Sequence, residues 1–295
     1  MLTSHPTDQR RAAMLMLGSV ALFSLMDAGL KTLSAHYPPF QVAALRGASS
    51  LPLVAAWALA TVGWRPLLRV RWPLHLLRGV LGIVMMASFV YALRTLPLST
   101  AYSIFFVAPL LISALSVPIL CEYVGPRRWA AIVIGLLGVL VVLRPTGQGM
   151  LTMAGFAVLL AALGYAVSAI TMRVLARTDP TQATTFWLLA MMALGAGALA
   201  LPNWVPLRGE HLWIIAGIGV AGAFGQWAIT EAFSRGEASL IAPLEYSALI
   251  WGVLLDIALW GVLPDGMTWL GAGIIIASGL YLLRRERVHA EAEHP

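Results

Sequence analysis

The most constraining feature of this sequence is a series of ten long apolar stretches, separated by short gaps that carry prolines, glycines and charged residues. A helix needs about 20 mostly apolar residues to cross roughly 30 Å of hydrocarbon. We therefore predict ten membrane-spanning helices, near residues 12–34, 40–62, 76–96, 98–119, 127–144, 151–175, 181–201, 211–233, 238–262 and 266–284. Only 11% of the residues are charged, against about 25% in soluble domains. A surface this poor in charge is expected to face a lipid bilayer, so the fold class is an all-α integral membrane protein.

The basic residues are distributed unevenly between the gaps. With the N-terminus inside the cell, 13 of the 19 fall in cytoplasmic segments and 4 in outer segments. Cytoplasmic loops of membrane proteins carry an excess of Lys and Arg, so we predict that both termini are cytoplasmic. The same rule explains the net charge of +6, and we expect no nucleic-acid partner. A single lysine among many Arg, Ala and Gly residues indicates a GC-rich bacterial genome, hence a bacterial inner membrane.

Weak internal similarity divides the chain into two copies of one unit. The matches lie 140 or 141 residues apart: Trp129 with Trp269, Arg144 with Arg284, and Pro39-Phe40-Gln41 with Pro180-Thr181-Gln182. Five helices per copy is an odd number, so the second copy must enter the membrane inverted. We predict repeats at residues 1–145 and 146–295, an arrangement typical of transporters that expose one midplane site to either side.

These features resemble the drug/metabolite transporter superfamily, in its EamA branch. The resemblance covers about residues 14–285, and its clearest part is the segment Ala108-Pro109-Leu110 through Leu120-Cys121-Glu122 with the following Gly135-Leu136-Leu137-Gly138 helix. The family usually has glycine before that acid, where this chain has Cys121, and the second copy has Gly261-Val262 without an acid. The resemblance implies ten helices in two five-helix repeats, and within the branch it is closest to bacterial exporters of aromatic amino acids.

Ionisable residues within the apolar stretches are the first candidates for cargo binding, because each costs about 2.5–3.5 kcal/mol on insertion. Asp27 and Lys31 are four residues apart on one helix face, and Arg46 is expected at a similar depth on the second helix. They could orient an amino and a carboxylate group, or they could form an ion-pair network that braces two helices. The spare cation favours cargo binding for Arg46.

Glu245 is a further candidate, beside Tyr246 and shortly after Pro243. A proline frees a backbone carbonyl, and broken membrane helices often line binding sites. Glu245 could contact cargo or couple protons, or it could cap exposed backbone near the end of its helix. Aromatic and hydroxyl side chains within spans complete the candidate set: Ser88, Tyr91, Tyr102, Tyr165, Trp227 and Tyr246. Pockets for small molecules combine aromatic walls with a few polar groups, although packing between helices also uses such residues.

The motifs HExxH, CxxC and GxxxxGK[ST] do not occur in the sequence. We therefore expect no enzyme activity, no cofactor and no metal site. The sequence predicts an exporter or facilitator of small metabolites, and most specifically of α-amino acids with large, aromatic side chains. Two alternatives stay open: a transporter of the same fold for drugs, nucleosides or sugars, and a membrane enzyme acting on lipids. The sequence leaves the oligomeric state open.

Overall fold

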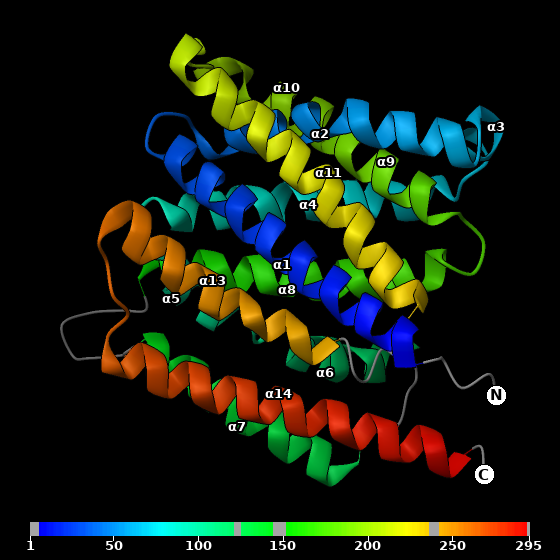
Figure 1. Ribbon diagram of the computed structural model, residues 1–295, viewed down its shortest axis with the longest axis vertical. Coiled ribbons are helices and arrows are strands. Elements are labelled where there is room, and N and C mark those ends of the chain that lie inside the picture. Colours follow the sequence, from blue (N-terminus) through cyan, green and yellow to red (C-terminus); the bar gives the residue numbers. More distant parts are fainter. Residues whose placement is uncertain (1–5, 121–124, 144–151, 236–241, 294–295) are drawn as a thin grey trace. The chain divides into compact units, whose positions relative to one another are not determined.

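The computed structural model describes residues 6–120, 125–143, 152–235 and 242–293 (Figure 1), and within these ranges all regular elements are helices. The α-helices are α1 (Pro6–Ser34), α2 (Pro39–Thr61), α3 (Trp64–Leu68), α4 (Trp72–Leu93), α5 (Leu98–Phe105), α6 (Ala108–Leu120), α7 (Pro126–Leu143), α8 (Met153–Leu175), α9 (Thr181–Met191), α10 (Gly197–Ala200), α11 (Leu212–Arg235), α13 (Ala248–Leu255) and α14 (Gly266–Glu293). Cys121, Glu122, Arg144 and the predicted repeat boundary lie outside the described residues.

Eight helical segments of the described part are long and apolar enough to cross a membrane. They occupy the positions of the first four predicted spans and of the sixth to ninth. Shorter apolar helices, Trp129–Leu143 and Gly266–Tyr281, occupy the positions of the fifth and tenth. The all-helical membrane architecture is thus confirmed, and eight of the ten predicted spans have the length of a membrane crossing.

Several spans are less regular than the sequence predicted. The fourth consists of α5 and α6, which are separated at Phe106 and Val107. The seventh continues from α9 through a π-helical turn, Met192–Ala196, into α10. The ninth begins as a 3-10 helix, Ala242–Ser247, and ends in a second π-helical turn, Asp256–Trp260. Pro243 lies in that 3-10 segment, as expected of a residue without a backbone N–H.

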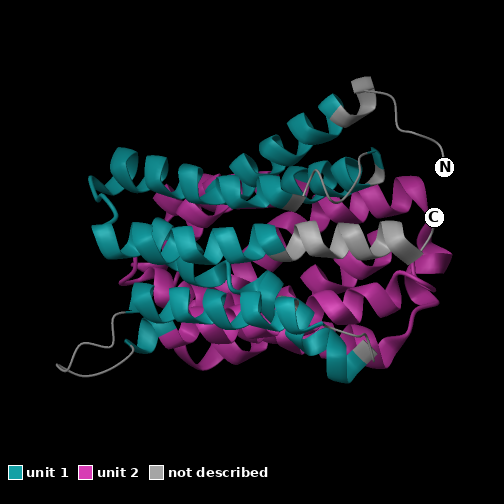
Figure 2. Cartoon of the chain, turned by 90° about the horizontal axis from the view of Figure 1, so that it is seen from below, with its two compact units in different colours: residues 1–24, 97–155, 224–295 teal, residues 25–96, 156–223 magenta. Residues whose placement is uncertain are grey.

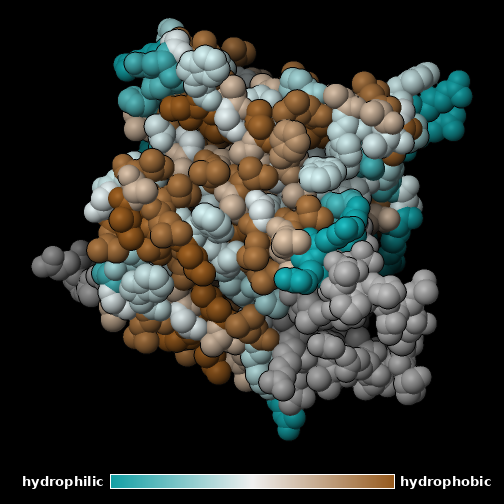
Figure 3. All heavy atoms as spheres, in the orientation of Figure 1, coloured by the Kyte–Doolittle hydropathy of each residue, from teal (hydrophilic) through white to brown (hydrophobic). Residues whose placement is uncertain are grey.

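The surface is rich in large apolar side chains. Leu194, Met153 and Leu263 are each at least 70% exposed, and Trp213 is 84% exposed. Figure 3 shows hydrophobic residues over much of the described surface on one face of the molecule. Exposure on this scale would be a liability in water, and it suits contact with lipid.

The chain separates into two compact units, each assembled from distant stretches (Figure 2). Unit 1 comprises residues 1–24, 97–155 and 224–295, and unit 2 comprises residues 25–96 and 156–223. Each unit therefore combines segments from both predicted repeats.

In unit 1, α7 and α14 pack closely through glycines. A Cβ atom added at Gly271 of α14 would lie 2.7 Å from the carbonyl oxygen of Gly138 and 3.0 Å from the amide nitrogen of Val142, both on α7. Backbone atoms of the two helices are therefore in near contact, as small residues permit in membrane proteins.

Asp256 makes the most complete polar contact in unit 1. Its side chain is fully buried and accepts hydrogen bonds from the backbone amides of Leu98, at 2.9 Å, and Ser99, at 2.8 Å. The Ser99 hydroxyl donates a third, at 2.6 Å. The first amides of a helix have no partner within it, so the Asp256 carboxylate caps the N-terminus of α5.

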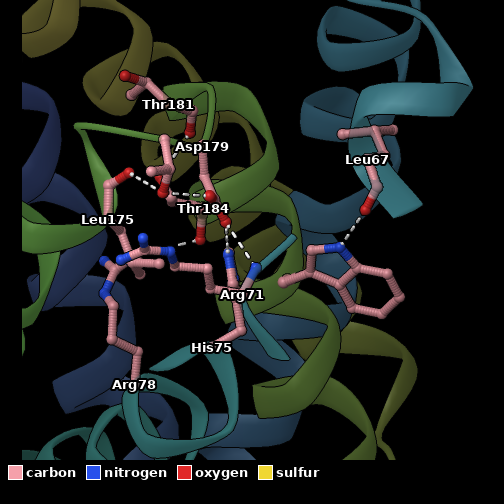
Figure 4. A network of polar contacts seen from close by, with 10 residues as sticks. Leu67, Arg71, His75, Arg78, Leu175, Asp179, Thr181 and Thr184 are labelled. Atoms are coloured by element: carbon pink, nitrogen blue, oxygen red, sulfur yellow. Dashed lines mark hydrogen bonds and ion pairs between the residues drawn. The ribbon is translucent and has the colours of Figure 1, made fainter. Parts of the chain in front are cut away.

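In unit 2, Asp179 plays a similar part at the start of α4 (Figure 4). Its Oδ2 atom accepts hydrogen bonds from the Arg71 amide, at 3.0 Å, and from Nε2 of His75, at 2.9 Å. Its Oδ1 atom accepts one from the Thr178 hydroxyl, at 2.7 Å. Burial by itself raises the pKa of the Asp179 carboxyl. The hydrogen bonds from Thr178, Arg71 and His75, with the charge of His75, outweigh burial and lower that pKa.

A second loop of unit 2 is anchored in a related way without a carboxylate. The Tyr37 hydroxyl lies 2.8 Å from Nδ1 of His211 and accepts a hydrogen bond from the Arg208 amide at 3.0 Å. In both places a side chain just before a proline-led helix binds the amide of an arginine and a nearby histidine. Tyr37 precedes Pro39, and Asp179 precedes Pro180. These are the segments that the sequence matched at a shift of 141 residues.

Gly271→Ala tests the contact between α7 and α14. We expect it to lower the thermal unfolding temperature of the purified protein in detergent, because forced overpacking typically costs about 1–3 kcal/mol. Gly273→Ala, on the same helix, is the matched control, since no atom lies within 4 Å of an added Cβ there. Equal stability of the two variants would show that the glycine contact contributes nothing.

Asp179→Asn tests the charge at the start of α4. A carboxyl whose folded pKa is lowered stabilises the protein above its unfolded pKa, near 3.9, and that stabilisation is lost as the pH falls through the folded pKa. We therefore expect the variant to unfold at a lower temperature than the wild type at pH 6, and the difference to shrink below about pH 4. Thermal unfolding measured from pH 6 to pH 3 checks this. A difference that stays constant over the range would contradict it.

Candidate substrate site

Unit 2 holds three of the predicted charged residues, on neighbouring turns of α1 and on α2. Asp27, Lys31 and Arg46 are all partly buried within membrane spans. The Asp27 carboxylate acts electrostatically on the Arg46 guanidinium, so the structure brings these two charges near each other as predicted. Lys31 is used at least partly for structure, because its Nζ donates a hydrogen bond of 2.9 Å to the backbone carbonyl of Leu96.

Arg46 is held at a close helix contact. A Cβ atom added at the next residue, Gly47, would lie 2.9 Å from the carbonyl oxygen of Leu189 and 2.7 Å from the amide of Ala193. That contact spans the end of α9 and the π-helical turn, a feature that frequently marks functional sites. The Nε atom of Arg46 is buried and has no hydrogen-bond partner within the described part of the chain. A buried N–H of a cation without an acceptor is costly, and a bound anion would satisfy it.

Arg78 on α4 is a cation that the sequence placed within a span but not among the site residues. Its side chain is 9% exposed. Its Nε donates to the Ser168 hydroxyl and one terminal nitrogen donates to the Thr184 carbonyl, each at 3.3 Å. Figure 4 shows Arg78 with Thr184 beside the Asp179 network. In the sequence, the signal that could have marked Arg78 as a candidate is an arginine within an apolar stretch.

The other candidates of unit 2 lie on α4 and α8. Ser88 is half-buried, while Tyr91 is 42% exposed and Tyr165 is 38% exposed. Tyr165 lies within electrostatic reach of Arg78. The two tyrosine rings thus have free surface that a ligand or lipid can contact.

Two aromatic candidates of unit 1 are packed inside it. Tyr102 is 6% exposed, and a Cβ atom added at Gly252 would lie 2.8 Å from its ring. Tyr246 meets Phe106 edge to face, with ring centroids 5.0 Å apart, and its hydroxyl abuts Gly279 of α14. The Tyr246 hydroxyl is buried without a hydrogen-bond partner in the described residues. Helix packing accounts for both rings.

The remaining candidates of unit 1 differ in exposure. Trp227 on α11 is 45% exposed. Glu245 lies partly buried in the 3-10 segment, and no described residue donates a hydrogen bond to its carboxylate. No polar contact of Trp227 or of the Glu245 carboxylate is found within the described part of the chain. Within the described ranges, no three His, Cys, Asp or Glu side chains are grouped so that they could hold a metal ion.

Relatives with assigned cargoes share this architecture over most of their length. A riboflavin transporter of Vibrio cholerae is 28% identical, covering 95% of this chain and 92% of its own. The pseudopaline exporter CntI of Pseudomonas aeruginosa is 26% identical, covering 90% and 93%. An S-adenosylmethionine uptake transporter of Rickettsia prowazekii is 27% identical, covering 75% and 74%. None of these three is named for amino-acid export, so the predicted amino-acid cargo finds no support among them.

A solved crystal structure of a protein superposes with a TM-score of 0.63 at 24% identity, covering 92% of this chain and 96% of the other, which supports the fold. The family model of EamA-like transporters matches the chain twice, at residues 10–144 and 152–284. These two matches confirm the resemblance that the sequence indicated. The chain therefore belongs to the EamA-like transporter family, as a multi-pass membrane transporter of small metabolites.

Proposed function

We propose that the protein moves a small metabolite with an anionic group across the bacterial inner membrane, and that Arg46 and Asp27 contact this cargo. The observation that carries the proposal is the buried Arg46 Nε without an acceptor, on a cation within electrostatic reach of Asp27. A guanidinium has five N–H donors in a planar fork, which matches a carboxylate or phosphate. The cargo would supply the acceptor that the described residues do not provide.

The pairing of opposite charges favours a zwitterion over a simple anion. An ammonium group can bind the Asp27 carboxylate while a carboxylate binds Arg46, which is the arrangement an α-amino acid requires. Of the cargoes named for the relatives, S-adenosylmethionine combines an α-amino-acid group with an aromatic base. We therefore propose as cargo a metabolite that carries an amino-acid group and a ring, with free aromatic amino acids as one member of that class.

The exposed rings of Tyr91 and Tyr165 suit the ring of such a cargo. Aromatic pairs contribute about 0.5–1.5 kcal/mol beyond the burial of their area. That contribution is modest, which permits release. Trp227 and Glu245 remain candidate contacts on the sequence evidence.

We further propose alternating access by two inverted five-helix repeats with both termini in the cytoplasm. Support comes from the two family matches and from the related anchors at Tyr37 and Asp179. Inverted halves can exchange roles, so that one site faces either side of the membrane in turn. No nucleotide-binding motif is present in the sequence, so transport would run on a gradient or on exchange.

Reporter fusions test the orientation. Alkaline phosphatase fused at the C-terminus is expected to be inactive, because the excess of basic residues retains cytoplasmic segments inside. The same reporter fused after Arg208, in a predicted outer loop, is expected to be active and serves as the control. High activity of the C-terminal fusion would overturn the orientation.

Arg46→Ala tests the cargo contact. We expect transport per molecule to fall by about ten-fold or more, because a charged hydrogen bond contributes about 1.5–3 kcal/mol. The assay is uptake into proteoliposomes of labelled S-adenosylmethionine, riboflavin, phenylalanine, tryptophan and threonine, with and without a pH gradient. Arg46→Lys keeps the positive charge but lacks the planar set of N–H donors of a guanidinium. We therefore expect a transport rate between those of the wild type and Arg46→Ala.

The alternative role of Arg46 is to brace α1 against α2. In that case Arg46→Ala would lower thermal stability and the amount of protein in the membrane, and transport per molecule would survive. Normal transport by a folded Arg46→Ala protein, for a cargo that the wild type moves, would therefore refute the cargo contact.

A further inference from the structure

Arg78 has more donors than its surroundings use. The guanidinium lies in the membrane span of α4, yet among the described residues it has two hydrogen bonds, both 3.3 Å long and both to neutral oxygens, those of Ser168 and Thr184. Hydrogen bonds at this distance are at the weak end of the range. Three of its five N–H groups are thus without an acceptor from the described residues.

The charge of Arg78 is also unbalanced. No carboxylate of the described residues forms an ion pair with it, and Tyr165 is the only ionisable group there that acts on it electrostatically. The Asp179 carboxylate, drawn beside Arg78 in Figure 4, accepts hydrogen bonds from the Arg71 amide, His75 and Thr178 instead. A cation within a span normally pairs with an acid or with backbone carbonyls, or it serves a cargo pathway. Among the described residues Arg78 has one such carbonyl, that of Thr184, and no acid.

Arg78 and Arg46 lie at different levels along α9. Arg78 binds the carbonyl of Thr184, whereas Gly47, next to Arg46, meets the carbonyl of Leu189. Five residues of helix separate these two carbonyls, which corresponds to about 8 Å at 1.5 Å per residue. The Arg78 side chain and the backbone next to Arg46 therefore contact α9 at different levels.

We propose that Arg78, with Ser168, forms a second binding position for an oxyanion group of a soluble metabolite, a carboxylate or a phosphate. The position is distinct from the Arg46–Asp27 pair, because Arg78 lies on α4 and its hydrogen bonds go to Ser168 of α8 and Thr184 of α9. The Arg78 fork supplies charge and N–H donors, and the Ser168 hydroxyl orients the fork through Nε. A role of this position in transport rests on the proposed function, whereas its binding of oxyanions is measured independently of transport.

Thermal unfolding with simple oxyanions tests the proposal. The purified protein is titrated with sodium acetate and sodium phosphate at constant ionic strength, with chloride as the balancing anion. A ligand that binds only the folded state raises the unfolding temperature in a saturable way. The titrations are carried out in an Arg46→Gln background, so that Arg46 does not contribute.

In that background we expect a saturable response that Arg78→Gln abolishes or weakens by about ten-fold or more. Arg78→Lys should weaken the response less, because the charge remains. Arg177→Gln removes an exposed arginine in the loop after α8 and should leave the response unchanged. If Arg78 only braces α4 against α8 and α9, Arg78→Gln would lower the starting unfolding temperature and keep the oxyanion response, which would overturn the proposal.

Two additional variants and a lipid ligand distinguish the remaining explanations. If Arg78→Gln does not fold, Ser168→Ala and Arg78→Lys replace it, and an unchanged oxyanion midpoint in both would overturn the proposal. A response to short-chain phosphatidylglycerol without one to free oxyanions would assign Arg78 to lipid and also overturn it. Transport that is independent of Arg46 would refute the proposed function alone, since the oxyanion titration would be unaffected.

Discussion

Backbone amides at helix starts must find acceptors inside this protein, because lipid offers none. In unit 1, the buried Asp256 carboxylate accepts hydrogen bonds from two backbone amides at the start of α5 and from one hydroxyl. An unsatisfied group within a membrane costs several kcal/mol. Outside the candidate spans, Asp179 accepts the amide of Arg71 just before α4, and Tyr37 accepts the amide of Arg208. These contacts tie the loops of unit 2 to the ends of α4 and α2.

The same requirement supports the roles proposed for Arg46 and Arg78. Most buried polar side chains in unit 2 have a protein partner, as Gln41 does in its two hydrogen bonds with the backbone of Val205. Arg46 and Arg78 are different, because their guanidinium donors exceed the acceptors that the described residues provide. Evolution can replace a buried cation by an apolar residue of similar size at little cost to stability. Two arginines that keep unused donors in membrane spans are therefore better explained by an anionic ligand than by stability.

The sequence predicted the class of fold and part of the site, because both depend on local pattern. Length and hydropathy located the spans, and the spacing of Asp27 and Lys31 placed them on one face. The partners of Asp256 and Asp179 could not be predicted, since they lie 157 and 108 residues away. The same limit applied to the packing of Tyr102 against Gly252 and of Tyr246 against Phe106 and Gly279. Their contact with cargo stays a prediction. Arg78 was not among the predicted site residues, because the sequence does not show that the described residues around it supply two neutral oxygens and no carboxylate.

The two related anchors of unit 2 differ in charge, and this difference has a consequence under the proposed inverted repeats. Two identical inverted halves would make the inward-facing and outward-facing states equal in energy, because each state would be the mirror arrangement of the other. Tyr37 and Asp179 each accept the amide of an arginine, but only Asp179 carries a charge, and only its contact varies in strength with pH near the unfolded pKa of a carboxyl. Contacts that are related in the two predicted repeats and unequal in chemistry remove the degeneracy. A transporter built from such inverted repeats can thus favour one resting state, while the repeats still allow the other state to form.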